Sequence, residues 1–223
     1  MTTGAEIVNV PLGEDYPDIR EGVRRICADF PDAYWRNLDK EEAYPTEFVK
    51  AMSDAGYLAS LIPEEYGGAG LPIRAAGVIL QECHANGCYA AAAHAQMYTM
   101  GTLLRHGSEE QKRKYLPRIA TGELRLQAFG VTEPTTGTDT TKLKTKAVRD
   151  GDHYVVTGQK VWISRALHSD LLLLLCRTTP VDQVTKKTDG LSVLLVDLRE
   201  AKGNGLEIRK LDAMINHNTT ELF

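Results

Sequence analysis

The residues with the clearest chemical potential lie between positions 129 and 164. Residues 132–139 form a turn in which threonine hydroxyls surround a proline and a glycine. Such a turn is rigid and presents hydroxyl and backbone N–H donors, which suit a phosphate or the polar edge of a ring. A β-rich run further along ends at residues 162–164 with a flat ring, an apolar side chain and a hydroxyl, in the order Trp-Ile-Ser.

Two motifs in this segment resemble the flavin signature of the acyl-CoA dehydrogenase family. Residues 131–139 read VTEPTTGTD and match the family form VTEP-x-x-G-S/T-D. Residues 158–164 read GQKVWIS and match G-Q-K-x-W-I-S/T at the expected separation. The resemblance continues upstream through residues 62–72 and 106–124, so it covers nearly the whole chain.

The resemblance implies an FAD enzyme that introduces a double bond between Cα and Cβ of an acyl-CoA thioester. In this chemistry a carboxylate removes the α-proton, flavin N5 accepts a hydride from the β-carbon, and hydrogen bonds to the thioester oxygen acidify the α-proton. The family's base is a glutamate on a C-terminal helical domain, and no residue here aligns with it. We therefore expect this chain to lack that domain and a catalytic residue, to bind FAD weakly and to be inactive alone.

Partners also follow from the resemblance. It implies an acyl-CoA substrate, electron-transfer flavoprotein as electron acceptor, and a homo-oligomer, a dimer or tetramer, in the complete protein. Two alternatives remain open. One is a non-catalytic flavin-binding or CoA-binding remnant that works as an interaction partner, and the other is a superfamily relative such as a flavin monooxygenase or nitroalkane oxidase.

Contacts with the flavin ring are assigned by the resemblance to both motifs. Val131 and Thr132 would offer a backbone N–H and a hydroxyl to the pyrimidine side of the isoalloxazine, which makes the flavin a better electron acceptor. Trp162 would lie against the ring system, and Ser164 would point its hydroxyl towards N5. Ile163, which lies between them in the sequence, would also belong to the cofactor-binding site. The alternative for Trp162 is a buried side chain that anchors the β domain, because aromatic residues dominate protein cores.

The remaining assignments concern the ends of the ligands. Gly137 and Thr138 would approach the FAD pyrophosphate, with Thr138 also facing the CoA substrate, and Phe129 would flank the ring. Met97 and Met100 could line the acyl pocket, since this region borders the fatty chain in the family. Core packing is the competing interpretation, because methionines at helical spacing usually fill gaps.

Two charged residues in this region need separate interpretations. Glu133 lies inside the first motif, where the family has a turn residue, and its carboxylate is expected to accept hydrogen bonds from neighbouring backbone N–H groups. Arg165 and Ala166 replace the Asn-Gly or Asn-Ala common after Ser164 in the family. Arg165 is the less conservative change, and it indicates a different substrate or electron acceptor.

Composition excludes several classes of protein. The formal charge of −4 and the spread of basic residues leave no basic face for nucleic acid. No apolar run is long enough to span a membrane, and the N-terminus resembles neither a signal nor a transit peptide, so we expect a cytoplasmic protein. The four cysteines lack metal-ligand spacing and are expected to be reduced, packed thiols, with no metal site.

Helical periodicity runs from residue 15 to about residue 124. It predicts helices between residues 15 and 30, after Pro45, on either side of residues 86–87, and from a capping box at residues 108–111. These helices are expected to form an all-α bundle spanning residues 1–125.

Period-two alternation follows, and predicts an antiparallel β-barrel domain over residues 126–223. The expected strands are 127–131, 143–148, 154–163, 171–176, 191–198 and 206–210, and a further β-like segment begins at residue 218. The Asp-Gly pair at residues 150–151 predicts a hairpin between the second and third strands. The fold class is therefore α+β, with a helical domain followed by a barrel.

Overall fold

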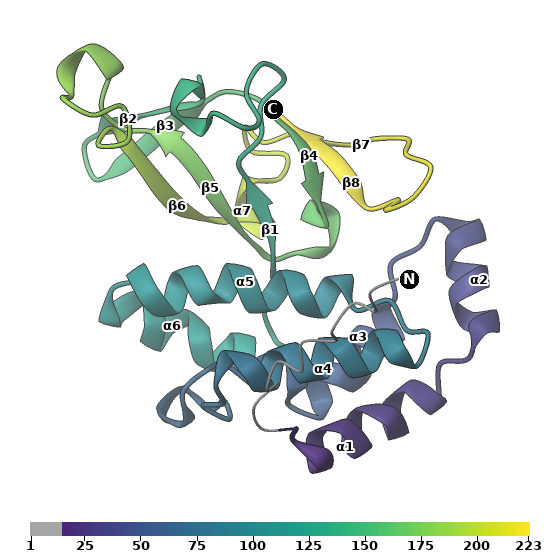
Figure 1. Ribbon diagram of the computed structural model, residues 1–223. Helices are drawn as coiled ribbons and strands as arrows, with labels where there is room; N and C mark the ends of the chain where they lie inside the picture. Colours follow the sequence, from purple (N-terminus) through teal and green to yellow (C-terminus); the bar gives the residue numbers. More distant parts are fainter. Residues whose placement is uncertain (1–14) are drawn as a thin grey trace, which may run out of the picture.

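The computed structural model describes residues 15–223, in which a helical part is followed by a β part (Figure 1). The helical part comprises α1 (Pro17–Ala28), α2 (Asp32–Glu41), α3 (Thr46–Asp54), α4 (Ile73–Ala85), α5 (Ala91–His106) and α6 (Glu109–Ala120). The predicted helical bundle is thus present, and the change from helix to strand falls between Ala120 and Leu126. Among the described residues, no helix has the length and apolar character needed to cross a membrane.

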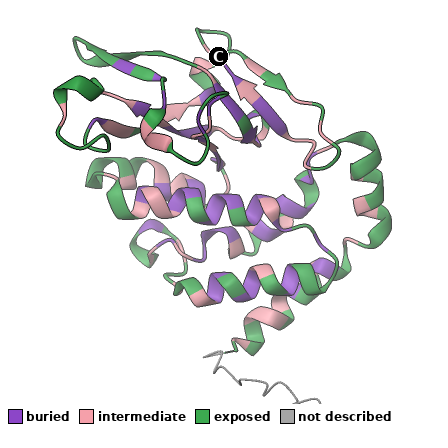
Figure 2. Ribbon diagram, turned by 45° about the horizontal axis from the view of Figure 1, so that its top comes forward, coloured by how far each residue is buried: buried purple, intermediate pink, exposed green. Residues whose placement is uncertain are grey.

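One core of the helical part lies between α1, α3, α4 and the start of α5. Val23 and Cys27 of α1 are buried there beside Cys83 and Cys88, and burial raises the pKa of these three thiols, to about 12 for Cys83 and Cys88. Figure 2 shows this buried stripe running along the helices. All four cysteines are buried free thiols, as the sequence predicted.

Helix α2 was not predicted. Pro31 ends the pattern of α1 in the sequence, but in the structure it also precedes the first turn of α2. None of the residues of α2 is fully buried, so its apolar positions are too few to give a helical period. The helix packs through partly buried Tyr34 and Trp35, whose rings meet edge to face with Phe30 and Phe48.

The capping box before α6 is confirmed. Ser108 Oγ accepts the Gln111 backbone N–H at 3.1 Å, and Gln111 Oε1 accepts the Ser108 N–H at 2.9 Å. Two backbone donors at the helix start are thereby satisfied by side chains.

Replacing Ser108 with alanine should lower the free energy of unfolding by about 1 kcal/mol, because the Gln111 N–H loses its acceptor. Urea denaturation of the chain measures this loss. Ser108→Gly is the control and should cost only a few tenths of a kcal/mol, since glycine allows water to solvate the helix end. Equal losses for alanine and glycine would show that the hydroxyl does not stabilise α6.

The β part consists of two sheets. Its strands are β1 (Leu126–Gly130), β2 (Lys146–Asp150), β3 (His153–Thr157), β4 (Lys160–Ser164), β5 (Leu171–Arg177), β6 (Leu191–Asp197), β7 (Ile208–Lys210) and β8 (Thr219–Leu222). One sheet has the order β1-β5-β2-β3 with β6 also paired to β5, and the other has the order β4-β8-β7. The β2–β3 hairpin is confirmed, with Asp150 opposite His153 across the turn.

The predicted closed antiparallel barrel is wrong in two respects. The described strands pair as two separate sheets, and β5 runs parallel to β1 and to the start of β2. Between β1 and β5 the chain makes a turn, the β2–β3 hairpin and β4. This long connection returns it to the starting end of β1, which a parallel pair requires.

The single strand predicted over residues 154–163 is divided between the two sheets. Strand β3 ends at Thr157 and β4 begins at Lys160, and Gly158 lies between them. A Cβ atom at Gly158 would come within 2.3 Å of Thr145 Oγ1, so the chain passes too close to Thr145 for any side chain. The alternation of apolar and polar residues continues through the point where the chain passes from one sheet to the other. The sequence pattern therefore did not indicate a break at Gly158.

The helical and β parts share a buried contact. Met100 and Leu103 of α5 pack in one core with Leu126 of β1 and Leu171 of β5. Across the same contact, the Tyr44 hydroxyl donates to Gln127 Oε1 at 2.7 Å. Figure 1 shows α5 lying beneath β1, so the β part packs against the helical part through this helix.

Candidate functional site

The threonine-rich turn after β1 is built around the Glu133 carboxylate. Glu133 and Thr136 exchange two backbone hydrogen bonds of 2.9 and 3.1 Å, which close the turn. The Glu133 carboxylate is buried and accepts the N–H groups of Lys144 at 2.6 Å and Thr145 at 2.9 Å. The prediction that Glu133 binds backbone N–H groups is confirmed, but the donors lie 11 and 12 residues further along the chain and not in the same turn.

Lys160 of β4 completes this arrangement. Its Nζ lies 2.9 Å from Glu133 Oε1 and donates to the Val131 carbonyl at 3.0 Å, with 2% of the lysine and 4% of the glutamate side chain exposed. Burial alone would raise the pKa of Glu133, but hydrogen bonds from Thr145, Lys144 and Lys160 outweigh it and hold that pKa below its usual value. Glu133 therefore stays ionised at neutral pH, but both of its oxygens are buried and already accept hydrogen bonds, so the carboxylate is not free to take a proton from a substrate.

A backbone contact brings the two sequence motifs side by side. The Val161 N–H of β4 donates to the Thr132 carbonyl at 2.9 Å. Together with the Lys160–Glu133 ion pair, this bond fixes the turn against β4. Among the described residues, the Thr132 hydroxyl has no hydrogen-bond partner, so it is free to bind a ligand on this edge.

Trp162 projects from β4 because the strand carries a bulge. Between the paired positions Lys160 and Ile163, β4 has one residue more than β8. Trp162 takes a positive φ of 62°, and the residue is 63% exposed, whereas Val161 and Ile163 on either side are buried. A bulge of this kind re-aims a side chain, and a bulky residue at positive φ is rare outside functional positions. The alternative of a buried Trp162 in the core is wrong.

Ser164 lies two residues further along β4 and is oriented by Asn216. The Asn216 Nδ2 donates to Ser164 Oγ at 3.0 Å, so the hydroxyl proton of Ser164 remains available to a ligand. Asn216 comes from the segment between β7 and β8, and the sequence analysis did not single it out. It stands in a polar stretch without period, which gave no signal.

The other residues of the sequence prediction lie in different surroundings. Gly137 is close to Thr132, since a Cβ atom on Gly137 would meet Thr132 Cγ2 at 3.9 Å, and Thr138 beside it is exposed. Phe129 is half-buried, with its ring centroid 6.4 Å from that of Tyr98. The Ile163 side chain belongs to the core between the sheets, and its carbonyl accepts the Thr220 hydroxyl.

Comparison with family models decides the relationship. The model described as "Acyl-CoA dehydrogenase, N-terminal domain" matches residues 13–123, and the model described as "Acyl-CoA dehydrogenase, middle domain" matches residues 128–223. The chain belongs to the acyl-CoA dehydrogenase family.

Individual relatives agree with this assignment. An acyl-CoA dehydrogenase of Mycobacterium tuberculosis is 39% identical over 173 residues, covering 77% of this chain and 43% of the relative. The glutaryl-CoA dehydrogenase of Desulfococcus multivorans is 32% identical over 213 residues, covering 92% of this chain and 52% of the relative. Among solved structures, the acyl-CoA dehydrogenase from Geobacillus kaustophilus matches with a TM-score of 0.80 at 29% identity, covering 93% of this chain and 55% of that one. This chain thus spans about half the length of these family members.

An acyl-CoA dehydrogenase uses FAD, and the donors on this edge of the β part fit such a group. The exposed Trp162 ring offers a flat apolar face, and the unpartnered Thr132 hydroxyl and the Ser164 hydroxyl lie on the same pair of neighbouring segments. A planar ring with polar atoms along its edges requires this combination of a stacking face and hydrogen-bond donors. The residues present are therefore chemically suited to an isoalloxazine.

The two methionines proposed for the acyl pocket of this family member lie in the helical part. Met100 is completely buried, packed with Leu103 and Leu116. Met97 is also buried, in the core shared with Met52 and Ile79. Met100 therefore fills a gap in the bundle, as in the competing interpretation given above, and has no exposed surface. Met97 also lines a surface pocket beside Tyr98 and Leu104, so its contact with an acyl chain stays a prediction.

Proposed function

We propose that this chain forms the flavin-binding wall of an FAD-dependent acyl-CoA dehydrogenase, an oxidoreductase that oxidises the Cα–Cβ bond of an acyl-CoA thioester. The observation that carries the proposal is the bulge in β4, which exposes Trp162 beside the Thr132 turn. A strained φ and an exposed aromatic ring both cost free energy, and a flat ligand stacked on the ring would offset that cost. Membership of the family supports the same function.

Each proposed role follows from the exposure or the hydrogen-bonding state of the residue. Trp162 would stack on the isoalloxazine, and Thr132 would donate its hydroxyl to the pyrimidine side of the ring. Ser164, whose oxygen already accepts a hydrogen bond from Asn216, would direct its proton to N5. When bound, FAD supplies the acceptor for the hydride that leaves the substrate β-carbon.

Proton abstraction is assigned to no residue described here. Glu133 is the carboxylate nearest to the proposed flavin edge in sequence, but its two oxygens bind Lys160, Lys144 and Thr145. A base must be free to accept a substrate proton, and this carboxylate is saturated and buried. We propose that the base comes from outside residues 15–223.

Several wider features of the protein remain proposals. We propose two domains, residues 1–125 and 126–223, because the helices end at Ala120 and the strands begin at Leu126. Gly137 and Thr138 would face the pyrophosphate and the CoA, and Phe129 would flank the ring. An acyl-CoA substrate, electron transfer to electron-transfer flavoprotein, a homo-oligomeric complete protein and a cytoplasmic setting follow from the family resemblance and the composition.

Titration of FAD into the 223-residue chain tests the proposal. A saturable change in the visible flavin absorption band is expected, and an unchanged band at all protein concentrations would contradict the assignment. Acyl-CoA is then added to the flavin-loaded chain. A shift of the band without bleaching would show a thioester bound against the ring and a base located elsewhere, whereas bleaching would show dehydrogenation by these residues themselves.

A further inference from the structure

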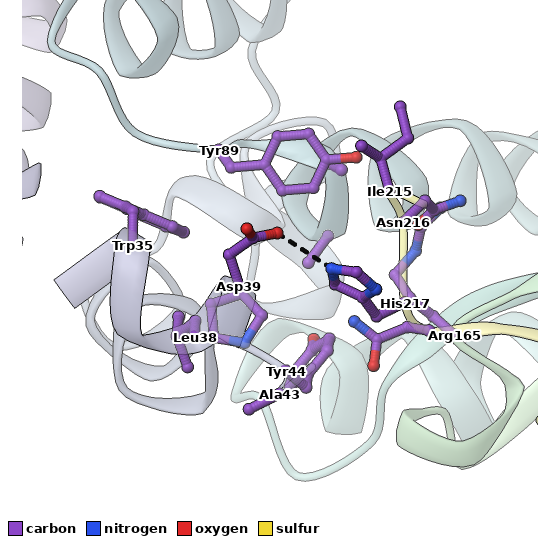
Figure 3. A pocket seen from close by; sticks show the side chains of 14 residues that line it. Trp35, Leu38, Asp39, Ala43, Tyr44, Tyr89, Arg165, Ile215, Asn216 and His217 are labelled. Atoms are coloured by element: carbon purple, nitrogen blue, oxygen red, sulfur yellow. Dashed lines mark hydrogen bonds and ion pairs between the residues drawn. The ribbon is translucent and has the colours of Figure 1, made fainter. Parts of the chain in front are cut away.

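A cavity of about 330 Å³ lies between α2, the start of α5 and the segment joining β7 to β8 (Figure 3). Trp35, Leu38, Ala92 and Ile215 give it largely apolar walls. Its charged and titratable lining residues are Asp39, Tyr44, Tyr89, Arg165 and His217. The size is that of a site for a small organic molecule.

Arg165 is the unusual member of this lining. It follows β4 directly, takes a positive φ of 63°, and its N–H donates to the Asn218 carbonyl at 2.7 Å. Only 9% of the residue is exposed, and its Nε is buried without a hydrogen-bond partner. No carboxylate of residues 15–223 forms an ion pair with its guanidinium.

A buried guanidinium without an anion is costly, because desolvation of the charge is not offset by an opposite charge. The one acidic residue of the cavity does not offset it. Asp39 Oδ1 lies 2.9 Å from His217 Nε2, and the Asp39 side chain is 73% exposed at the rim (Figure 3). The acid therefore faces the histidine and water, and Arg165 is left as an uncompensated cation.

His217 adds a second polar atom without a partner. Its Nε2 faces Asp39, which requires a proton on Nε2, and its Nδ1 is buried without a hydrogen bond. Nδ1 accepts a hydrogen bond in the neutral ring and donates one in the charged ring. Two of the residues that line the cavity, Arg165 and His217, thus each have a buried polar atom without a hydrogen-bond partner.

We propose that this cavity binds the carboxylate of a small aliphatic acid, with Arg165 as its counter-ion. Arginine pairs with carboxylates through charge-assisted hydrogen bonds, and the Arg165 guanidinium belongs to the lining of the cavity without a carboxylate partner among residues 15–223. Trp35, Leu38 and Ile215 provide the apolar surface for the aliphatic stem. Those walls disfavour a free phosphate, which is strongly hydrated on every side. Carboxylate binding at this site does not require flavin, so this proposal can be tested independently of the function proposed above.

Pentanoate is the probe, with pentanamide as its uncharged isostere. Binding to the 223-residue chain is followed through the Nε–H resonance of Arg165 in NMR spectra. Saturable shifts with pentanoate, and at least about tenfold weaker binding of pentanamide, are expected from the loss of one charge-assisted hydrogen bond. Equal affinities for the acid and the amide, or equal binding of inorganic phosphate, would overturn the assignment.

The variant Arg165→Asn tests the residue itself. Asparagine tolerates positive φ better than other side chains, so the backbone turn is retained while the charge is removed. The variant should bind pentanoate at least about tenfold more weakly and, without pentanoate, should unfold at a higher temperature than the unmodified chain. Arg36→Gln is the matched control on the exposed face of α2, and it should change neither quantity. If Arg165→Asn unfolded at a lower temperature than the unmodified chain without ligand, or bound pentanoate with unchanged affinity, the proposal that Arg165 is an unpaired arginine in a carboxylate site would be refuted.

Discussion

Replacing Lys160 with methionine should destabilise the chain by about 3–5 kcal/mol, the cost of removing one partner from a buried ion pair. Methionine fills the space of the lysine stem but leaves the Glu133 carboxylate charged and buried. The Val131 carbonyl loses its donor at the same time. The Glu133 carboxylate keeps its hydrogen bonds from the Lys144 and Thr145 N–H groups. Because these bonds still stabilise the charge, we expect a loss near the lower end of this range. Urea denaturation measures it.

A double substitution separates the ion pair from simple packing. With Glu133→Gln added to Lys160→Met, no charge is left in the core. The Lys144 and Thr145 N–H groups bind different oxygens of Glu133, so the single glutamine oxygen can still accept one of them. The double variant is therefore expected to be more stable than Lys160→Met alone. Lys142→Met, at an exposed position on the following turn, is the control and should change stability by less than about 0.5 kcal/mol. A loss at Lys160 no larger than that at Lys142 would show that the ion pair does not hold the turn against β4.

Local interactions were readable from the sequence. The Asp-Gly turn of the β2–β3 hairpin and the Ser108 capping box depend on residues close together in the chain, and both form as predicted. The spacing of Val23 and Cys27 likewise follows from one helix burying one face. In each case the partners are within a few residues of one another, so the pattern contains the whole interaction.

Features that depend on distant partners were not readable. The bulge at Trp162 arises from the pairing of β4 with β8, and the parallel pairing of β1 with β5 depends on the path of the chain between them. Asn216 reaches Ser164 from a different strand connection. The motif around Trp162 indicated a site, but the exposure of its ring and the partner of its serine follow from tertiary structure.

Replacing Trp162 with alanine should weaken FAD binding by about tenfold or more, because an aromatic stacking contact is worth about 0.5–1.5 kcal/mol beyond the area it buries. The residue is 63% exposed, so removal of its ring takes little from the core. The free energy of unfolding should therefore change by less than about 0.5 kcal/mol. Flavin fluorescence titration and urea denaturation of the same preparation measure the two effects.

Two controls decide whether the loss comes from stacking at this position. Trp162→Phe keeps an aromatic face and should retain most of the affinity, and Tyr154→Ala removes a partly exposed aromatic ring from β3, outside the proposed flavin wall, and should leave affinity unchanged. If Trp162→Ala bound FAD as tightly as the unmodified chain, the exposed ring would not be the stacking face. If instead its affinity and its stability fell together, Trp162 would be holding the bulge of β4 in place, and the ligand would have to be sought on another face of the β part.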